Sequence, residues 1–538
     1  MPYVTGPVES LESLLSPEEA LVILREADPS SALFLRARNF CNDIVEVQPR
    51  IPRPTPRQER RFLTIGMATH DDFDGCYFTI LAIRLFHPEI WDDLEILVVD
   101  NNPAGPCGSA LKEFEHWVPH YRYIPYNSRQ STASRDLVFR EAAGDFVLCV
   151  DSHVLFPAGA LSRFVDYCRA HPDTNDLLQG PLIGDDFLPH AACFKPVWCV
   201  GMYGQWDSDE RANDPDAPPF ETLMQGLGVF GCRREAWPGF NPRLAGFGGE
   251  EGYIHEKIRR AGGRNLCLPF LRWLHRFERP MGVRYTLTNY DRIRNYLLIY
   301  DELALDPAPV VDHFTDYLGK EQAQEALDSV QTELRSPFHF FDTIYCLNLD
   351  RQPERWTVME ERFRSLSIHR AVRRFPAADT PVDPRIGHVL SHRRAIAQAS
   401  VENLEYILLF DDNIRFSPDA SRVLAAALGE LAGREWDLLF LGGYRLMDPV
   451  PNAPACAPLP ATLTVVPMPG THAMACRHTA YDAILKALPG NAADAVLWLD
   501  RYPSLAEFYA TGLGAARKFF TPSPIAIVEN GQSCPTPI

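Results

Sequence analysis

The residues of the N-terminal half that could do chemistry centre on a possible metal site. Asp151 and His153 lie two residues apart directly after the apolar run 147–150, and a third candidate ligand, His275, lies further along the chain. Carboxylates suit Mn²⁺ or Mg²⁺, and imidazoles favour Mn²⁺ or another transition ion. A cation held here would stabilise the charge of a departing diphosphate as a Lewis acid. The alternative is an acidic strand end with solvated histidines.

Two acids after a glycine-rich loop form the second candidate. The loop 246–249 leads into Glu250, Glu251 and the helical stretch 253–260. This order places two carboxylates near a helix N-terminus, where the helix dipole favours negative charge. One of them could act as a general base. The alternative is a first helical turn that merely favours acidic residues.

The elements around these residues predict a parallel sheet. Buried strands alternate with helices in the order strand 62–67, helix 77–86, strand 94–99, helix 109–116 and strand 146–150. This βαβαβ order predicts a mostly parallel sheet that binds ligands at the carboxyl ends of its strands. Two of these strands run into acids, Asp100 and Asp151. We therefore expect the functional residues at that edge of the sheet.

A second α/β pattern follows in the C-terminal half. Its predicted strands are 343–349, 406–410 and 437–441, and its predicted helices are 354–366, 391–401 and 420–431. The two halves share one design, although the chain contains no short-period repeat. The predicted fold class is therefore α/β, with two Rossmann-like domains of mostly parallel sheet in tandem.

Breaks in these patterns predict the domain boundaries. Residues 9–40 are predicted to be helical, with a capping box that begins at Ser16, and the proline-rich run 49–56 is predicted to be an extended linker. The polar stretch 320–334 is predicted to be a helical bridge. The expected divisions are a helical extension with linker at 1–60, a first domain at 61–304, a bridge at 305–338 and a second domain at 339–538.

The composition is that of a globular protein. The chain has 538 residues, of which 46% are hydrophobic, and its formal net charge is -18. This charge argues against binding to nucleic acid or to an anionic membrane, which needs clustered lysine and arginine. No stretch reaches the roughly 18 apolar residues that span a bilayer, and no signal-peptide pattern opens the sequence. We expect no transmembrane segment, a cytoplasmic location and reduced cysteines.

Residues of the first half, from about 62 to 300, resemble the GT-A glycosyltransferases of family 2, in the branch shared with polypeptide N-acetylgalactosaminyltransferases. The resemblance rests on motifs in a shared order: Ile65–Thr69, Val98–Asn102, Ser134 with Arg135, Ala142–Asp145, Asp151 with His153, Gly248–Glu251 and His275. It implies a manganese ion, or Mg²⁺ in its place, on Asp151, His153 and His275.

The same resemblance implies roles for the other motif residues. Thr69 and Asp100 would contact the nucleoside, and Arg135, with Asp151, would contact the nucleotide or its diphosphate. Glu250 would lie beside donor or acceptor hydroxyls. Glu251 would be the base of an inverting enzyme, although it stands where inverting relatives carry an aspartate, and a retaining enzyme needs no such base.

Residues of the second half, from about 340 to 530, resemble the family 25 glycosyltransferases, which include lipooligosaccharide and collagen galactosyltransferases. The matching residues, in chain order, are Asn348, Asp350, Arg355, Ser391, His392, Asp411 and Asp412. The family usually carries Glu-Asp-Asp at the acidic strand end, whereas this chain has Phe410 in place of the glutamate. The second domain would therefore be either a second transferase or a degenerate module that binds an acceptor.

Together these features predict a metal-dependent glycosyltransferase. It would transfer a hexose or an N-acetylhexosamine from a nucleotide sugar, expected to be a UDP-sugar, to a hydroxyl of a glycan, lipid-linked or protein acceptor. The alternative is a non-catalytic carbohydrate- or nucleotide-binding scaffold whose two transferase domains have decayed. A nucleotidyltransferase or phosphotransferase is disfavoured because the chain has no Gly-x-x-x-x-Gly-Lys-Ser/Thr phosphate loop.

Overall fold

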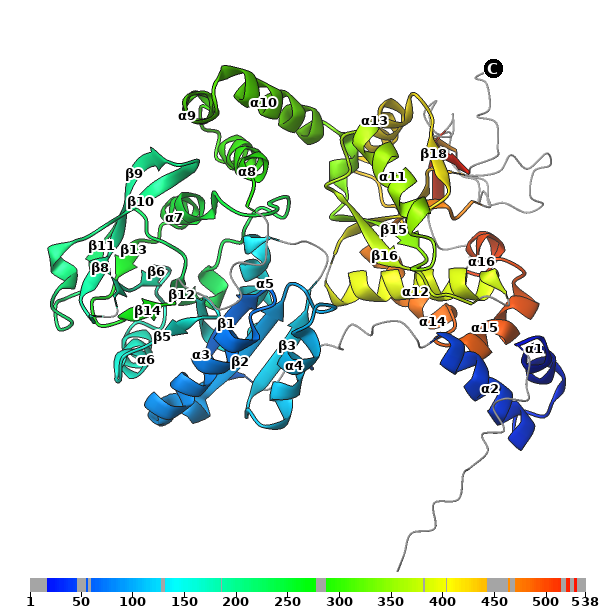
Figure 1. Cartoon of the computed structure of the whole chain (residues 1–538), viewed down its shortest axis with the longest axis horizontal. Helices are drawn as coiled ribbons and strands as arrows, with labels where there is room; N and C mark the ends of the chain where they lie inside the picture. Colours follow the sequence, from blue (N-terminus) through cyan, green and yellow to red (C-terminus); the bar gives the residue numbers. More distant parts are fainter. Residues whose placement is uncertain are drawn as a thin grey trace, which may run out of the picture. The chain divides into compact units, whose positions relative to one another are not determined.

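The computed structural model divides the chain into two compact units (Figure 1). The N-terminal unit consists of residues 49–331, and the C-terminal unit combines the N-terminal helices with residues 332–538. The described residues are 17–45, 55–56, 60–126, 131–184, 186–276, 287–380, 383–402, 404–442, 463–464, 470–513, 519–522 and 527–529.

The N-terminal unit is built on an eight-stranded sheet with the strand order β11-β13-β6-β12-β4-β1-β2-β3. Its strands are β1 (Arg61–Thr69), β2 (Leu94–Asp100), β3 (Tyr121–Pro125), β4 (Gly144–Val150), β6 (Leu177–Gln179), β11 (Phe220–Glu221), β12 (Val229–Arg233) and β13 (Asn265–Cys267). The four strands β4, β1, β2 and β3 are parallel neighbours, and β12 is antiparallel to both β4 and β6. The carboxyl ends of β1, β2 and β4 therefore lie along one edge.

Helices cover both faces of this sheet: α3 (Phe73–Phe86), α4 (Gly108–Glu113), α5 (Arg135–Glu141), α6 (Ala160–Ala170), α7 (Glu250–Arg260) and α8 (Asn289–Glu302). Helix α9 (Ala308–Leu318) packs on α8 and is followed by α10 (Lys320–Leu334). Alternate residues of each strand enter opposite layers, so Val98 packs with α3, α4 and α6, while Val99 packs with α5 and α7. Because both faces of such a strand are buried, its sequence is a continuous apolar run.

A smaller sheet lies beyond the end of β4. Its strands are β5 (Val154–Leu155), β7 (Leu182–Ile183), β8 (Pro189–Ala191) and β14 (Trp273–His275), in the order β5-β14-β7-β8. Strands β5 and β14 pair in antiparallel fashion with His275 opposite Val154. A separate hairpin is formed by β9 (Cys193–Cys199) and β10 (Met202–Asp207). The small sheet brings two segments that are distant in the sequence to the edge where β4 ends.

The C-terminal unit contains a seven-stranded sheet with the order β16-β15-β17-β21-β19-β22-β20. Its strands, with those of the small ladder β18–β23, are β15 (Thr343–Asn348), β16 (Val372–Pro376), β17 (Tyr406–Asp411), β18 (Ile414–Phe416), β19 (Leu438–Phe440), β20 (Leu463–Thr464), β21 (Ala473–Arg477), β22 (Phe519–Pro522) and β23 (Ile527–Glu529). Strand β15 is parallel to β16 and β17, and β21 is antiparallel to β17 and β19.

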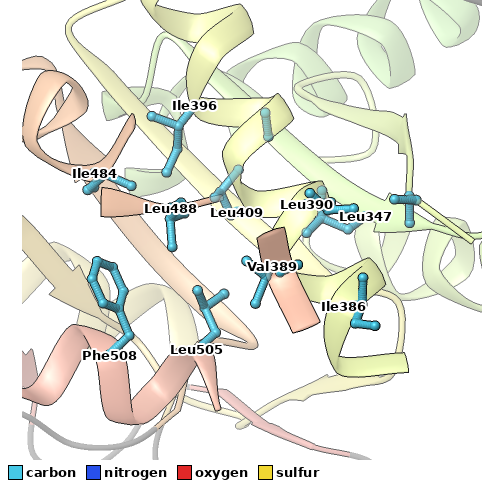
Figure 2. Packing of buried hydrophobic residues seen from close by; sticks show 14 of the residues in the cluster. Leu347, Ile386, Val389, Leu390, Ile396, Leu409, Ile484, Leu488, Leu505 and Phe508 are labelled. Atoms are coloured by element: carbon cyan, nitrogen blue, oxygen red, sulfur yellow. The ribbon is translucent and has the colours of Figure 1, made fainter. Parts of the chain in front are cut away.

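Two helical layers enclose this second sheet. The helices are α11 (Pro353–Ser365), α12 (Pro384–Val401), α13 (Ala420–Leu431), α14 (Tyr481–Ala487), α15 (Ala492–Arg501) and α16 (Leu505–Thr511). Leu409 packs into the layer that contains α12 and α14 to α16, and Phe410, the next residue of β17, packs into the layer of α11 and α13. Figure 2 shows Leu347 and Leu409 of the sheet against Val389 and Leu390 of α12.

The two N-terminal helices complete the core of the C-terminal unit. Helix α1 (Pro17–Glu26) and helix α2 (Ala32–Val45) contact each other and α15, and Figure 1 shows them, in dark blue, beside α15. Leu24 and Phe34 are buried in the same cluster as Leu499. Arg25 adds an ion pair to Asp500, at 3.2 Å. The start of the chain is thereby tied to its last third.

The α/β fold class predicted from the sequence is confirmed, since each unit contains a predominantly parallel sheet with helices on both faces. Within the region 9–40 that was predicted to be helical, the described residues form two helices, and the turn at residues 27–31, with Pro29, separates α1 from α2. Ser16 and residues 49–54 of the predicted linker lie outside the described residues. No helix among the described residues has the length and apolar character needed to cross a membrane.

Candidate functional site

The three ligands predicted from the sequence come together at the carboxyl end of β4. Asp151 and His153 follow β4 directly, and His275 ends β14, which pairs with the strand just beyond His153. The Nε2 atoms of His153 and His275 are 3.1 Å apart, and His275 Nε2 lies 3.5 Å from Asp151 Oδ2. One nitrogen or oxygen of each of the three side chains falls within 4.8 Å of the others.

These separations fit a single cation. Two ligand atoms bound to one ion at about 2.1 Å lie roughly 3.0–3.5 Å apart in octahedral or tetrahedral geometry. Both measured distances, 3.1 and 3.5 Å, match that range. The donor set of one carboxylate and two imidazoles suits Mn²⁺ or a neighbouring transition ion better than Ca²⁺ or Mg²⁺.

Asp72 fixes the tautomer of His153 for this role. His153 Nδ1 lies 2.8 Å from Asp72 Oδ2, and because a carboxylate only accepts hydrogen bonds, Nδ1 donates to it. The lone pair of Nε2 is then directed toward His275. Ser152 also donates its hydroxyl to Asp72 Oδ2, at 2.8 Å. Carboxylates that orient a ligating imidazole in this way are typical second partners of metal sites.

Arg135 holds the other side of the site. Its Nη2 donates to Asp151 Oδ1 at 2.7 Å, and its Nη1 lies 3.6 Å from Glu250 Oε1. Burial opposes ionisation of Asp151, but the guanidinium and the two imidazoles outweigh it and hold the pKa of Asp151 well below its usual range. Asp151 is therefore an anion across the physiological pH range. The site therefore holds a carboxylate next to a guanidinium. The carboxylate can bind a cation, and the guanidinium can bind an anion beside it.

The acids of the glycine-rich loop stand at the start of α7. Gly249 precedes the helix with φ 99°, a left-handed conformation that favours glycine, and Glu250 and Glu251 are the first two helical residues. Glu250 is 1% exposed. Burial and then the neighbouring carboxylate of Glu250 raise the pKa of Glu251 well above its ordinary value. A glutamate that binds its proton more tightly is suited to general-base chemistry.

The two remaining predicted residues of this unit end neighbouring strands. Thr69 and Asp100 are the last residues of β1 and β2 and face each other in register. Asp100 Oδ2 accepts a hydrogen bond from the Tyr123 hydroxyl at 2.7 Å, and Oδ1 accepts one from the Asn102 amide at 2.9 Å. Burial raises the pKa of Asp100 to about 6 although both hydrogen bonds oppose the shift.

In the C-terminal unit, the predicted residues divide between two places. Asp412 accepts hydrogen bonds from Asn348 Nδ2 at 2.7 Å and from Arg355 Nη1 at 3.2 Å. Arg355 and Asp412, together with Asp411, line a cavity of about 200 Å³. Asp350 instead pairs with Arg374, at 2.5 Å, and its side chain is 48% exposed. Asp350 therefore does not share the hydrogen bonds that join Asn348, Arg355 and Asp412.

His392 and Phe410 occupy the interior. His392 is fully buried, and burial lowers its pKa to about 3, so that its imidazole is neutral. Phe410 packs among Phe363 and Phe416 on the face of β17 opposite to the neighbouring carboxylate of Asp411. The apolar residue at the acidic strand end is therefore part of the core.

Two site residues were not predicted from the sequence. Asp72 caps α3, where its side chain accepts from the Gly75 amide at 3.2 Å, and His388 lies one helical turn before His392. Asp72 carried a signal, since an aspartate before a helical run is a typical N-cap. Its contact with His153 joins two segments 81 residues apart, which no local pattern shows.

We expect Asp72→Asn to weaken metal binding by the N-terminal unit about 10- to 100-fold, since outer-shell carboxylates have effects of this size. Asparagine keeps the helix cap, so the loss would reflect the charge on His153 and not the stability of α3. Titration with Mn²⁺, followed by electron paramagnetic resonance, measures the change. Asp74→Asn, in the first turn of the same helix, is the matched control and should bind Mn²⁺ like the unmodified chain. Equal affinity for Asp72→Asn would remove Asp72 from the site.

Sequence comparisons find similarity to two glycosyltransferase families. Residues 66–191 match the sequence model of the family described as "Glycosyl transferase family 2". A "Glycosyltransferase 25 family member" of Drosophila pseudoobscura pseudoobscura is 30% identical over 138 residues, which are 20% of this chain and 21% of that protein. The chain therefore spans about a fifth of the length of this curated relative.

Solved structures with a related arrangement are remote. A structure of GalNAc-T7 with UDP, GalNAc and Mn²⁺ matches with a TM-score of 0.36 and 14% identity, over 45% of this chain and 48% of that one. The mannosyltransferase PcManGT from Pyrobaculum calidifontis, in complex with GDP-Man and Mn²⁺, matches with a TM-score of 0.32 and 16% identity, over 59% and 85%. Residues 66–191, which include the end of β1, all of β2 and β4 and the Asp151–His153 motif, are thus similar to the family 2 glycosyltransferases.

Proposed function

We propose that the N-terminal unit transfers a hexose or an N-acetylhexosamine from a UDP-sugar to a hydroxyl acceptor. The observation that carries the proposal is the convergence of Asp151, His153 and His275 beside Arg135 at the carboxyl end of β4. This edge of a parallel sheet is where α/β folds bind their ligands. The family 2 match, residues 66–191, covers the carboxyl ends of β1, β2 and β4 at this edge but not β14. The alternative, a decayed scaffold, is disfavoured because all four side chains retain compatible geometry.

Each side chain has a task in this reaction. Asp151, His153 and His275 would hold Mn²⁺ or Mg²⁺, which when bound supplies Lewis-acid stabilisation of the diphosphate. Arg135 is held beside these ligands by its ion pair with Asp151, and from there its guanidinium would meet the diphosphate. Holding donor and acceptor in one geometry supplies the remaining part of the rate enhancement.

Glu251 would take the proton of the acceptor hydroxyl. Burial and then the carboxylate of Glu250 raise its pKa to about 8, which makes it a stronger base than an exposed glutamate once it is ionised above that pH. Glu250, which lies near Arg135, would hold a hydroxyl of the donor or the acceptor. This assignment implies an inverting transfer, in which the acceptor oxygen would attack the anomeric carbon, the bond from that carbon to the UDP oxygen would break, and Glu251 would accept the hydroxyl proton.

Asp100 and Thr69 would contact the nucleoside. The Asp100 carboxylate can accept a hydrogen bond from an N–H of the base while it is ionised, and its pKa lies at about 6. Because this pKa is raised, the acceptor form predominates above pH 6 and is lost as the pH falls through that value. We expect the Kd for UDP to rise about tenfold between pH 7 and pH 5.

Isothermal titration calorimetry with UDP over that pH range tests the prediction. In Asp100→Asn, binding should be weaker at pH 7 and nearly independent of pH. Asp93→Asn is the matched control, because Asp93 precedes the same strand at its opposite end and pairs with Arg169. A steep pH dependence that survives in Asp100→Asn would place the titrating group elsewhere.

The C-terminal unit would serve either as a second transferase or as a module that binds the acceptor. Its cavity beside Asp411 and Asp412, with Arg351 and Arg355 in the lining, is suited to an anionic or polyhydroxyl ligand. The proposal covers a hydroxyl acceptor on a glycan, a lipid-linked molecule or a protein.

Release of UDP from a panel of nucleotide sugars tests the proposed function. The full chain is stripped of metal and incubated with UDP-glucose, UDP-galactose, their N-acetylhexosamine counterparts and GDP-mannose, with Mn²⁺, with Mg²⁺ or with chelator alone. We expect metal-dependent hydrolysis or transfer from at least one UDP-sugar. If no nucleotide sugar binds or turns over, the scaffold alternative replaces the transferase.

A further inference from the structure

A second cluster with the same donor types lies in the C-terminal unit. His388 and His392 of α12 and Asp411 at the end of β17 each place one potential ligand atom within 4.8 Å of the other two. His388 Nε2 is 3.3 Å from Asp411 Oδ1, a separation expected for two ligands of one tetrahedral ion. The two imidazoles are nearly perpendicular, with ring centroids 4.7 Å apart.

The fold fixes these side chains in place. His388 and His392 are four residues apart and therefore lie on one face of α12. Figure 2 shows Ile386, Val389 and Leu390 of the same helix packed in the apolar core, which sets the rotation of α12 about its axis. Asp411 is held from the other side, since its amide donates to the His472 carbonyl at 2.9 Å. The cluster is thus preorganised by the core and is independent of any surface loop.

His392 supplies a second, independent indication of a ligand. It is 0% exposed, and within the described part of the chain neither of its ring nitrogens has a hydrogen-bond partner. A buried polar group without a partner destabilises a fold, so such groups are rare unless an ion, a water or a ligand meets them. A metal ion satisfies an imidazole nitrogen in this setting, and ligand atoms of two further side chains of suitable type lie within 4.8 Å.

The cavity described above gives the cluster access to solvent and to a ligand. His388 and Asp411 belong to its lining, whereas His392 lies behind them. Asp412, in contrast, is already engaged by Asn348 and Arg355. An ion on the cluster would have three protein ligands and an open position toward the cavity, the arrangement typical of catalytic and not of structural sites.

We propose that His388, His392 and Asp411 form a second binding site for a divalent transition-metal ion, with Zn²⁺ the ion that this donor set and tetrahedral spacing favour. The site is separate from the cluster of Asp151, and its existence does not depend on the proposed function of the N-terminal unit. The proposed site does not need an acid at position 410, where the sequence motif has Phe410. Its three ligands are Asp411 of β17 and the two histidines of α12.

Metal stoichiometry of the full chain tests the proposal. The metal-free protein is dialysed against micromolar Zn²⁺, and bound metal is counted by inductively coupled plasma mass spectrometry. We expect two ions for the unmodified chain, one for Asp151→Ala, and none for Asp151→Ala combined with His388→Gln. His478→Ala, a histidine of the same unit outside the cluster, serves as the control and should retain two ions.

Substitution with Co²⁺ in the Asp151→Ala background reports on the geometry. A visible absorption band of tetrahedral Co²⁺ should appear and should be lost in both His388→Gln and His392→Gln. Because His392 is buried, its variant can fail to fold, in which case His388→Gln, whose side chain is 33% exposed, decides the question. Circular dichroism of each variant establishes which chains are folded. Binding of one Zn²⁺ by the folded Asp151→Ala/His388→Gln chain, or no bound Zn²⁺ in the folded Asp151→Ala chain, would overturn the proposal.

Discussion

Asp151→Ala is expected to lower metal-dependent transfer roughly 10³-fold or more while the fold remains intact. The carboxylate is the anionic member of the three-residue cluster, and its ionisation is enforced by Arg135. Loss of charge stabilisation of about 4 kcal/mol at the departing diphosphate corresponds to this factor. Initial rates of UDP release at saturating Mn²⁺ measure the effect, and thermal unfolding establishes that the variant is folded.

Asp145→Ala is the matched control for this substitution. Asp145 lies at the opposite end of β4 and pairs with Arg60 at the surface. We expect its removal to leave the transfer rate within about twofold, since exposed ion pairs contribute little. Undiminished transfer by Asp151→Ala would exclude Asp151 from the site.

Glu251→Gln is expected to lower the rate of transfer about 10²- to 10⁴-fold, the usual contribution of a general base. The pH profile carries the sharper test. Burial and Glu250 raise the pKa of Glu251, so in the unmodified chain the rate should rise with pH as the carboxylate ionises, with a midpoint well above that of an ordinary glutamate. Glutamine has no such step, and its residual rate should be flat through the same range.

Glu256→Gln separates this role from a general effect on α7. Glu256 belongs to the same helix and forms ion pairs with Arg259 and Arg260 away from the cluster. It should show the unmodified pH profile. If Glu251→Gln retains full activity, the transfer does not use this base, and analysis of the product anomer should then reveal retention of configuration.

The strands that carry the first site were predictable because their composition leaves few alternatives. The apolar runs at 94–99 and 146–150 are too short for helices and each ends on an acid, and the structure extends them by only one or two residues, to β2 (Leu94–Asp100) and β4 (Gly144–Val150). Parallel order then places Asp100 and Asp151 on one edge. Local pattern and sheet topology were sufficient here.

The approach of His275 to His153 could not be predicted in this way. It depends on β5 and β14, strands of two and three residues whose pairing joins segments more than 100 positions apart. Strands this short leave no periodic signal in the sequence. The sequence offered His275 as a lone candidate ligand and the family resemblance implied its role, but only the pairing of β5 with β14 explains how it reaches His153.

The placement of the N-terminal helices shows a further limit of local patterns. An amphipathic helix shows that one of its faces will be buried but does not show against what. Leu24 and Phe34 pack into the core of the C-terminal unit, although they precede the first sheet in the chain. A fragment that begins at residue 332 would therefore lack part of its core, which is why the proposed experiments use the full chain.

Anomalous scattering at the manganese edge, from crystals of the full chain soaked with MnCl₂ and UDP, tests the central claim most directly. We expect a manganese peak about 2.2 Å from ligand atoms of Asp151, His153 and His275, in contact with the diphosphate of UDP. A diphosphate bound elsewhere, or these three side chains directed away from the ion, would contradict the proposed site.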